Sequence, residues 1–374
     1  MSHSQFQIDN TQVIKEKILL VGVEFPNDRD FQAALNEAQE LIRAVDGDLV
    51  EVAFCKREKP SSALFVGTGK AEELAQIVTV KKIDLAIFNH ELSPTQERNL
   101  EKILQCRVID RVGLILAIFA KRANTPEAKL QVETAQLTHL SARLVRGYSH
   151  LKSQKGGIGL KGPGETQLEI DRRLISQKIT RLKQNLATVK KHRNIQRQNR
   201  INNQLPIFSL VGYTNVGKST IFNHLTKSNV LAKDQLFATL DTTTRKLWLS
   251  EDVSIILSDT VGFVRNLPHK LIEAFSATLE ETLYADILLH VVDASDNEFE
   301  QKIQSVQKVL EEIGASEIHQ VIIYNKIDLT SVKQPEILYD ISNNIKAIRI
   351  SANQTESLNL LRQALIQIAS VMKK

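Results

Sequence analysis

The chain has 374 residues, more than one ordinary domain, so its length predicts two or three domains. Hydrophobic residues make up 42% and charged residues 24%, which is typical of a folded globular protein and argues against disorder along the whole chain. The net charge of +5 conceals an asymmetry, because residues 143–200 carry 15 Lys and Arg against 3 Asp and Glu, a net +12, and the remainder carries −7. This basic segment predicts a polyanionic partner.

Local features exclude several other kinds of protein. No run approaches the roughly 18 uncharged apolar residues of a membrane-spanning helix, and the polar N-terminus lacks the apolar core of a secretion signal. The two cysteines, Cys55 and Cys106, have no CxxC spacing, so we expect neither a disulfide framework nor a structural zinc site. These features predict a cytoplasmic protein, and we expect a monomer.

The N-terminal part of the chain alternates short apolar runs with helical patterns. Runs that predict strands lie at 18–23, 50–54, 64–66 and 84–88, and helical patterns lie at 31–45, 71–78 and 94–104. This alternation predicts a small, mostly parallel α/β domain over residues 1–125.

Residues 126–204 predict a basic antiparallel hairpin of two helices joined by a Gly-rich loop at 156–164. The second helix is expected to begin near Glu165. Its apolar residues form a heptad seam at Ile175, Ile179, Leu182, Leu186 and Val189. The alternative is a plain structural linker, although a solvated helix has no need of such one-sided basic charge.

Residues 205–374 begin with an apolar run at 207–211, which is followed by GYTNVGKS and then by a helical pattern. This is the GxxxxGKS loop in its strand–loop–helix setting, where glycines allow consecutive backbone N–H groups to face phosphates. Lys218 is expected to reach the β- and γ-phosphate oxygens as a catalytic residue, and Ser219 to ligate Mg²⁺. The loop residues expected to bind nucleotide are Gly212, Tyr213, Thr214, Asn215, Val216, Gly217, Lys218, Ser219 and Thr220.

Three further motifs follow in order, each at the end of an apolar run. They consist of Asp259, Thr260, Val261 and Gly262; of Asn325, Lys326, Ile327 and Asp328; and of Ser351, Ala352 and Asn353. Asp259 can hold Mg²⁺ through water. Gly262 can approach the γ-phosphate and is a catalytic candidate, like Lys218. Asp328 can accept hydrogen bonds from the N1–H and 2-amino groups of guanine, which adenine lacks. The four motifs together resemble those of translation-factor-type GTPases, which implies GTP and Mg²⁺.

Switch I, the segment that senses the γ-phosphate, lies between the loop and Asp259. Its expected nucleotide-binding residues are Phe237, Ala238, Thr239, Leu240 and Asp241. Thr239 is our choice for the second Mg²⁺ ligand and for a catalytic role. Thr243 is the alternative, because three adjacent threonines occupy positions 242–244.

The stretch GPGETQLEIDRR at 162–173 is more specific than any nucleotide motif. With FATLD at 237–241 and DTVGF at 259–263, it closely resembles the HflX family of GTPases, and FVGTGK at 65–70 and IDR at 109–111 resemble that family's N-terminal domain. One departure is Thr242, which stands where the family usually has Pro. Others are Thr355 and Ser357, which stand where glycines often occur.

This resemblance implies an N-terminal α/β domain, a helical hairpin, and a P-loop GTPase domain with a mostly parallel sheet flanked by helices. It implies binding of GTP and GDP and of the large ribosomal subunit and its rRNA, with a role in ribosome splitting, rescue or biogenesis. The candidate rRNA contacts are Lys152, Lys155, Lys161, Arg172 and Arg173. The resemblance also suggests that the N-terminal domain binds ATP. Gly67-Thr68-Gly69-Lys70 lacks the phosphate-loop spacing, however, and better fits a turn that directs Lys70 toward rRNA.

Two positions bear on catalysis. Phe263 follows the Asp-x-x-Gly motif where many GTPases have a Gln that orients water, which predicts slow basal hydrolysis and stimulation by the ribosome, with Arg265 the nearby cation. Asn215 resembles the K⁺-coordinating Asn of cation-dependent GTPases, or it caps the loop. Two other functions stay open: a non-catalytic, GTP-controlled rRNA-binding module, and a tRNA-modification-type GTPase, although the latter would want a C-terminal cysteine and none follows Cys106.

Overall fold

The computed structural model describes residues 15–26, 28, 30–146, 167–201, 205–227, 236–237, 239–265, 268, 271–272 and 275–372. The chain divides into two compact units, Met1–Arg111 and Val112–Lys374, each built around its own sheet. The Gly-rich loop, three candidate rRNA contacts (Lys152, Lys155 and Lys161) and Ala238 of switch I lie outside the described residues.

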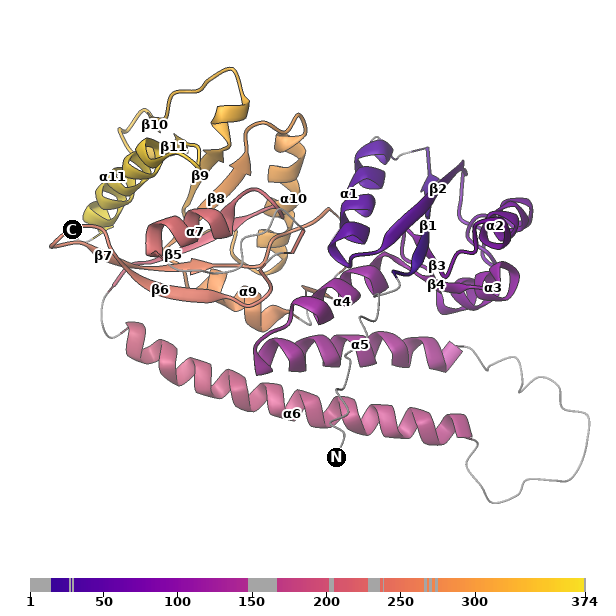
Figure 1. Cartoon of the computed structure of the whole chain (residues 1–374). Helices are drawn as coiled ribbons and strands as arrows, with labels where there is room; N and C mark the ends of the chain where they lie inside the picture. The colour runs from indigo at the N-terminus through magenta and orange to yellow at the C-terminus, as the bar shows by residue number, and fades with distance from the viewer. Residues whose placement is uncertain are drawn as a thin grey trace, which may run out of the picture. The chain divides into compact units, whose positions relative to one another are not determined.

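The first unit is a four-stranded, all-parallel sheet with the strand order β2-β1-β3-β4 (Figure 1). Its elements are β1 (Lys17–Glu24), α1 (Phe31–Ala44), β2 (Asp48–Lys56), α2 (Thr68–Lys81), β3 (Leu85–Phe88), α3 (Pro94–Leu104) and β4 (Arg107–Ile109). The predicted mostly parallel α/β fold of this part of the chain is therefore confirmed, in a compact unit that ends at Arg111. The three-residue strand β4 is too short to leave a periodic signal in the sequence.

The strand predicted at 64–66 is wrong. Phe65 has a positive φ of 62°, which is incompatible with an extended strand, and it forms only an isolated bridge with Ser61. The three residues Leu64, Phe65 and Val66 are nevertheless buried. The run is apolar because it enters the core as a turn, not because it joins the sheet.

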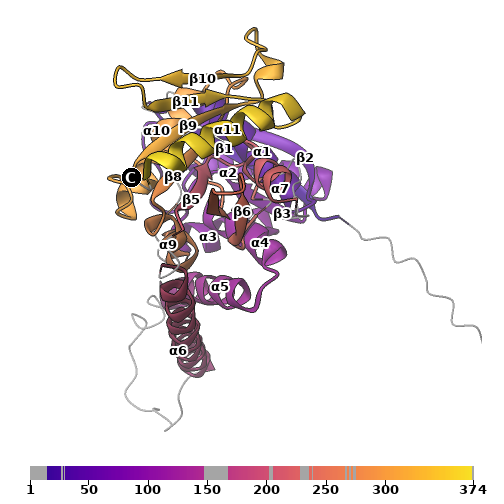
Figure 2. The ribbon, with the colours of Figure 1, turned by 90° about the vertical axis from the view of Figure 1, so that its left-hand side faces the viewer.

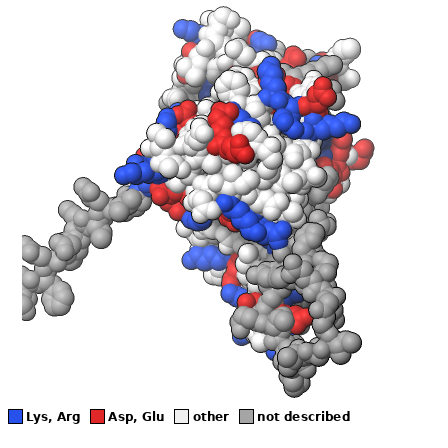
Figure 3. Space-filling view, turned by 90° about the vertical axis from the view of Figure 1, so that its right-hand side faces the viewer, with Lys and Arg blue, Asp and Glu red and all other residues white. Residues whose placement is uncertain are grey.

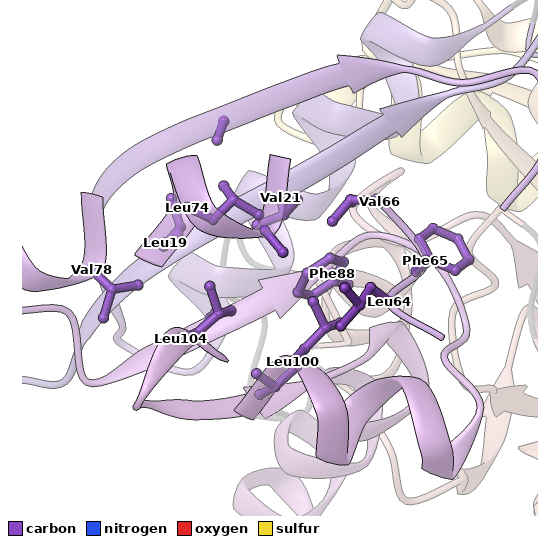
Figure 4. Close-up of a cluster of buried hydrophobic side chains, with 14 of the residues drawn as sticks. Leu19, Val21, Leu64, Phe65, Val66, Leu74, Val78, Phe88, Leu100 and Leu104 are labelled. Carbon is purple, nitrogen blue, oxygen red and sulfur yellow. The ribbon is translucent and has the colours of Figure 1, made fainter. Parts of the chain in front are cut away.

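The core of the first unit lies between the sheet and helices α2 and α3. Figure 4 shows the side chains that meet there, which include Leu19, Val21, Leu74, Val78, Phe88, Leu100 and Leu104. Helix α3 begins where the sequence dictates, because the Ser93 side chain accepts from the backbone of Gln96, the Gln96 side chain accepts from the backbone of Ser93, and Pro94 stands at the first helical position. The Gln96 amide also donates to the Ser61 carbonyl at 2.7 Å, which ties the apolar turn to this helix.

The Asp110-Arg111 pair at the end of β4 is part of a buried network. Arg111 forms an ion pair with Glu37 of α1, with side chains only 10% and 9% exposed, and donates to the Asn89 side chain at 2.9 Å. Asp110 is fully buried and accepts from the backbone of Leu92 at 3.3 Å. These contacts join β3, β4 and α1, so the pair stabilises the unit.

Three helices open the second unit: α4 (Arg111–Arg122), whose first residue still belongs to the first unit, α5 (Pro126–Arg146) and α6 (Gln167–Ile201). Figure 1 shows α5 and α6 lying side by side and running in opposite directions, as predicted for the hairpin. The predicted heptad positions of α6 are buried or half-buried, Leu182 most deeply, whereas most other described positions of this helix are exposed. An ion pair between Lys178 and Glu133, at 2.6 Å, joins the two helices.

A seven-stranded sheet forms the rest of the second unit, in the order β10-β11-β9-β8-β5-β7-β6. Its elements are β5 (Ile207–Gly212), α7 (Lys218–Thr226), β6 (Thr243–Trp248), β7 (Ser254–Asp259), α9 (Ser276–Leu283), β8 (Ile287–Asp293), α10 (Phe299–Glu312), β9 (Gln320–Asn325), a 3₁₀ turn (Ile327–Leu329), β10 (Glu336–Tyr339), β11 (Ile345–Arg349) and α11 (Thr355–Met372). Only the edge strands β6 and β10 are antiparallel to their neighbours.

Helices cover both faces of this sheet, with α7 and α11 on one face and α9 and α10 on the other (Figures 1 and 2). The central strand β5 is an almost continuous buried apolar run, as expected for a parallel strand covered on both sides. The predicted mostly parallel sheet flanked by helices is therefore confirmed. No helix among the described residues is long and apolar enough to cross a membrane.

The buried network of the first unit can be tested by Arg111→Met. We expect this change to lower the free energy of unfolding by about 3–5 kcal/mol, because it leaves the Glu37 carboxylate buried without its cation. Arg43→Met is the matched control, since Arg43 is 67% exposed in its ion pair with Glu40 and its loss is expected to cost under about 1 kcal/mol. Chemical denaturation followed by circular dichroism measures both. Equal losses in the two variants would contradict a stabilising role for the network.

Candidate nucleotide-binding site

The four motifs meet at one edge of the seven-stranded sheet. Strands β5, β7, β8, β9 and β11 are parallel, so their carboxyl ends lie together. Gly212 ends β5, Asp259 ends β7, Asn325 ends β9, and Ser351 follows β11. Ligands of open α/β sheets bind at this edge.

The phosphate loop requires Gly217 for both conformation and space. Its φ of +95° disfavours any residue with a Cβ, and a Cβ would lie 2.3 Å from the Asn325 side-chain nitrogen. Asn215 is exposed and also has a positive φ, of 64°. Tyr213, Thr214 and Val216 are buried, whereas Gly217, Ser219 and Thr220 at the start of α7 are half-buried.

Lys218 is buried beneath the loop. Its Nζ donates to the carbonyl oxygens of Gly212, at 3.0 Å, and Tyr213, at 2.6 Å. Burial lowers the pKa of Lys218 to about 8, although the nearby Asp259 carboxylate opposes this shift. A desolvated ammonium of this kind gains stabilisation from an anion, which is what a phosphate bound in the loop would supply.

Three side chains from separate elements bring oxygen atoms together. The Ser219 Oγ lies 2.6 Å from the Thr239 Oγ1 and donates to the Asp259 Oδ2 at 2.7 Å, and the Thr239 hydroxyl donates to the same Oδ2 at 3.2 Å. We call these three residues the oxygen cluster. Thr243, the alternative ligand, lies in β6, where it pairs with Asp259 in the antiparallel register.

The oxygen cluster fits a hard divalent cation. Two hydroxyls and a carboxylate are the ligands that Mg²⁺ prefers. The Asp259 Oδ1 is buried and has no hydrogen-bond partner among the described residues, so a carboxylate oxygen is left to interact with something else. Burial raises the pKa of Asp259, while hydrogen bonds from Ser219 and Thr239 counteract that rise. A cation here would offset the burial of this charge.

Switch II, the segment that follows β7, is hydrogen-bonded to the phosphate loop. The Phe263 carbonyl accepts from the backbone of Thr214 at 2.8 Å, and the Phe263 N–H donates to Gly212 at 3.1 Å. The Phe263 ring is buried, so it packs in the core. The Arg265 guanidinium donates to Glu298 at 3.1 Å and to Gln301 at 3.4 Å, so the nearest predicted cation is held by α10.

Gly262 approaches the loop closely. A Cβ at this position would lie 2.7 Å from the Thr214 Cγ2 and 3.1 Å from the Lys218 Nζ. The neighbouring Val261 and Thr260 are buried, and the Thr260 hydroxyl donates to the Leu210 carbonyl at 2.6 Å, which links β7 to β5.

The base-recognition motifs are joined through Asn325. Its amide donates to the Val216 carbonyl at 2.8 Å, and its side-chain oxygen accepts from the Ala352 N–H at 2.9 Å. This single buried residue therefore links the phosphate loop, the end of β9 and the segment after β11. Lys326 forms an ion pair with Asp293 at 2.7 Å.

Two buried polar atoms lie unsatisfied in these motifs. The Asp328 Oδ1 and the Ser351 Oγ have no hydrogen-bond partner among the described residues. Leaving such atoms unpaired is unfavourable, so a ligand with adjacent N–H groups fits this position. Ile327 is buried beside Asp328, and Asn353 is exposed.

The side chain of Asp241 is engaged outside the nucleotide motifs. Its carboxylate accepts hydrogen bonds from the backbone N–H groups of Asn124 and Thr125, at the start of α5. Phe237 and Leu240 of switch I are buried, and Phe237 packs against Phe119 of α4. The sequence did not indicate these partners: Thr125-Pro126 marks a helix start, but no spacing shows which distant carboxylate binds the backbone there.

The basic residues lie apart from this site in the sequence. Arg172 and Arg173 are exposed on α6. Lys70, at the start of α2, forms an ion pair with Glu73 at 2.7 Å. On the face shown in Figure 3, Lys and Arg side chains are interspersed with Asp and Glu.

Comparisons with known proteins match most of the chain. Family models match residues 32–120 (GTP-binding GTPase N-terminal), 122–200 (GTP-binding GTPase Middle Region) and 207–326 (50S ribosome-binding GTPase). The GTPase HflX of Escherichia coli K12 is 49% identical over 94% of this chain and 82% of its own length. The GTPase HflX of Caldanaerobacter subterraneus subsp. tengcongensis is 45% identical over 94% and 80%.

Among solved structures, the crystal structure of the SsGBP and GDP complex matches with a TM-score of 0.53 and 24% identity. The match covers 96% of this chain and 100% of that one. At this identity the likeness shows a shared fold.

Gly262→Ala tests the close approach of switch II. The added Cβ would push against Thr214 and Lys218, so we expect the rate of GTP hydrolysis to fall at least about tenfold while GDP affinity changes little. Gly69→Ala is the control, because a Cβ there meets nothing within 4 Å. Single-turnover hydrolysis and fluorescent GDP titration measure the two effects. An unchanged rate in the Gly262 variant would remove this residue from the catalytic group.

Proposed function

Because the chain belongs to the HflX family of GTPases, we propose that it is a GTP-hydrolysing switch that binds the large ribosomal subunit. GTP hydrolysis follows from the family and from the P-loop GTPase fold. The description of the matching G-domain family, 50S ribosome-binding GTPase, supports the proposed partner. In this proposal the N-terminal domain and the basic hairpin contact rRNA, and the protein acts in ribosome splitting, rescue or biogenesis.

One observation supports the proposal most strongly: the oxygen cluster and the buried Lys218 lie close together at the carboxyl edge of the sheet. Ser219 and Thr239 would hold Mg²⁺, which supplies neutralisation of phosphate charge when bound. Lys218 contacts the phosphates and Gly262 admits the γ-phosphate. The unsatisfied Asp328 carboxylate supports guanine as the base.

Slow basal turnover follows from the same geometry. Phe263 is apolar and buried, so it does not orient an attacking water, and Arg265 is bound to Glu298 and Gln301. Activation therefore has to come from outside these side chains. We propose that the large ribosomal subunit supplies it, and that a K⁺ ion held near Asn215 contributes.

The hairpin is the proposed rRNA contact. Its two helices pack through the apolar seam and leave Arg172 and Arg173 exposed, in a segment of net charge +12 over residues 143–200. Exposed Lys and Arg that neutralise phosphates release counterions, which makes binding steeply dependent on salt.

Guanine selectivity is tested by Asp328→Asn. The variant replaces an acceptor with an amide that also donates, so it opposes the guanine N–H groups. We expect GTP affinity to fall at least about a hundredfold and xanthosine triphosphate to bind better than GTP. Competition titration with both nucleotides measures the change. Unaltered GTP affinity would remove Asp328 from base recognition.

The proposed function itself is tested by single-turnover GTP hydrolysis in K⁺ and in Na⁺, with and without large ribosomal subunits. We expect slow hydrolysis by the isolated protein, at least about tenfold stimulation by large subunits, and faster rates in K⁺ than in Na⁺. Fast hydrolysis in Na⁺ without ribosomes would contradict both modes of activation. Ribosome binding without any turnover would favour the non-catalytic binding module.

The hairpin contact is tested by Arg172→Gln combined with Arg173→Gln. If both side chains contact phosphates, co-sedimentation with large subunits should weaken, and the slope of log affinity against log salt should fall by about two. Lys308→Gln with Lys333→Gln is the control, because these lysines are exposed elsewhere in the second unit. The same loss in both variants would indicate a general charge effect rather than a contact of the hairpin.

A further inference from the structure

Asp241 connects switch I to the helical hairpin. Its Oδ2 accepts hydrogen bonds from the backbone N–H groups of Asn124 and Thr125, each at 3.2 Å. Its Oδ1 accepts from the Thr125 hydroxyl. Both carboxylate oxygens therefore form hydrogen bonds with a segment that lies more than a hundred residues earlier in the chain. A side chain engaged in this way is not directed at the nucleotide.

The partner of Asp241 is the N-terminus of α5, a helix of 21 residues. Thr125 caps this helix, because its Oγ1 accepts from the Ala128 N–H at 3.1 Å, and Pro126 occupies the first helical position. The first N–H groups of a helix lack internal partners and carry partial positive charge, which favours a carboxylate. The contact with Asp241 is thus charge-assisted as well as geometrically specific.

A second contact holds the other end of switch I. Phe237, 1% exposed, packs edge-on against Phe119 of α4, with ring centroids 4.7 Å apart and planes at 83°. Phe119 packs in turn against Phe275, with centroids 4.5 Å apart. The corner of α4 and α5 therefore contacts switch I on both sides of Thr239.

Thr239 lies between these two contacts, two residues from each. Its hydroxyl is 2.6 Å from the Ser219 Oγ and 3.2 Å from the Asp259 Oδ2, a geometry that requires the backbone of switch I to lie close to α7 and β7. Thr239 is 8% exposed although it belongs to a loop. A loop residue keeps such a position only when its neighbours are fixed.

We propose that Asp241 is a positioning residue for GTP hydrolysis, which binds the N-terminus of α5 and thereby holds Thr239 in the oxygen cluster. The inference rests on the proposed role of Thr239 as a Mg²⁺ ligand. The same contact ties the nucleotide site to the hairpin: when switch I leaves the oxygen cluster, the segment that leads into α5 loses its hydrogen bonds with Asp241, and when α5 is displaced, Thr239 loses its support.

The test uses the full chain without ribosomes. In Asp241→Ala we expect the Mg²⁺ concentration for half-maximal single-turnover hydrolysis to rise about tenfold and the maximal rate to fall about tenfold, because the metal ligand is no longer pre-positioned. GDP affinity should change less than about twofold, since the phosphate loop and base site are intact. Asp241→Asn keeps an acceptor oxygen and should restore part of the wild-type rate.

Two further variants separate positioning from lost stability. Ser93→Ala removes the cap of α3 in the first unit, and we expect it to leave the rate and the Mg²⁺ requirement unchanged. Thr125→Val removes the hydroxyl from the α5 side and should shift the Mg²⁺ requirement in the same direction as Asp241→Ala, which tests the contact even if the Asp241 variant does not fold. The two shifts should not add, because they break one contact.

A wild-type Mg²⁺ requirement and rate in Asp241→Ala would overturn the inference, as would fully additive effects of the Asp241 and Thr125 changes. Ribosomes are absent from this assay. Its result therefore tests the role of Asp241 even if the chain does not bind the large ribosomal subunit. Hydrolysis by the wild-type chain without any divalent cation would instead overturn the proposed metal site.

Discussion

The nucleotide site depends on one constraint, the burial of the Asp259 carboxylate at the end of β7. The residue is fully buried, and only one of its oxygens is hydrogen-bonded among the described residues. A buried carboxylate is unfavourable unless donors or cations surround it. Ser219 and Thr239 supply donors, and Lys218 supplies a nearby positive charge. This one group therefore joins the start of α7, through Ser219, to switch I, through Thr239.

The same site is held together by a second buried polar residue, Asn325. Its amide reaches the phosphate loop and its oxygen receives the Ala352 N–H, so three loops share one side chain. Because Asn325 is 2% exposed, these hydrogen bonds form in a low-dielectric setting where an unmade bond is expensive. The proposed base site is thus hydrogen-bonded to the phosphate loop, although their motifs are more than a hundred residues apart.

The helical hairpin carries basic charge and also contacts the nucleotide site. Its apolar seam along α6 is packed against α5, and the basic side chains of α6 whose burial the structure describes are exposed. The start of α5 receives the Asp241 carboxylate, and α4 receives the Phe237 ring. A proposed rRNA-contacting element and a proposed phosphate-sensing loop therefore share physical contacts, which is the requirement for one to affect the other.

The sequence alone was enough for features that depend on local patterns. The heptad seam of α6, the helix at 94–104 and the strand–loop–helix setting of GYTNVGKS each rest on spacing along the chain, and periodicity is a local property of the chain. Only the tertiary structure decided that Phe65 and Val66 form a buried turn, because a short apolar run is equally compatible with strand and core loop. It also decided that the Thr239 hydroxyl contacts the Ser219 and Asp259 side chains, whereas Thr243 pairs with Asp259 through the sheet, and that Asp241 contacts the start of α5. These outcomes depend on which distant segments meet, and residue spacing carries no information about that.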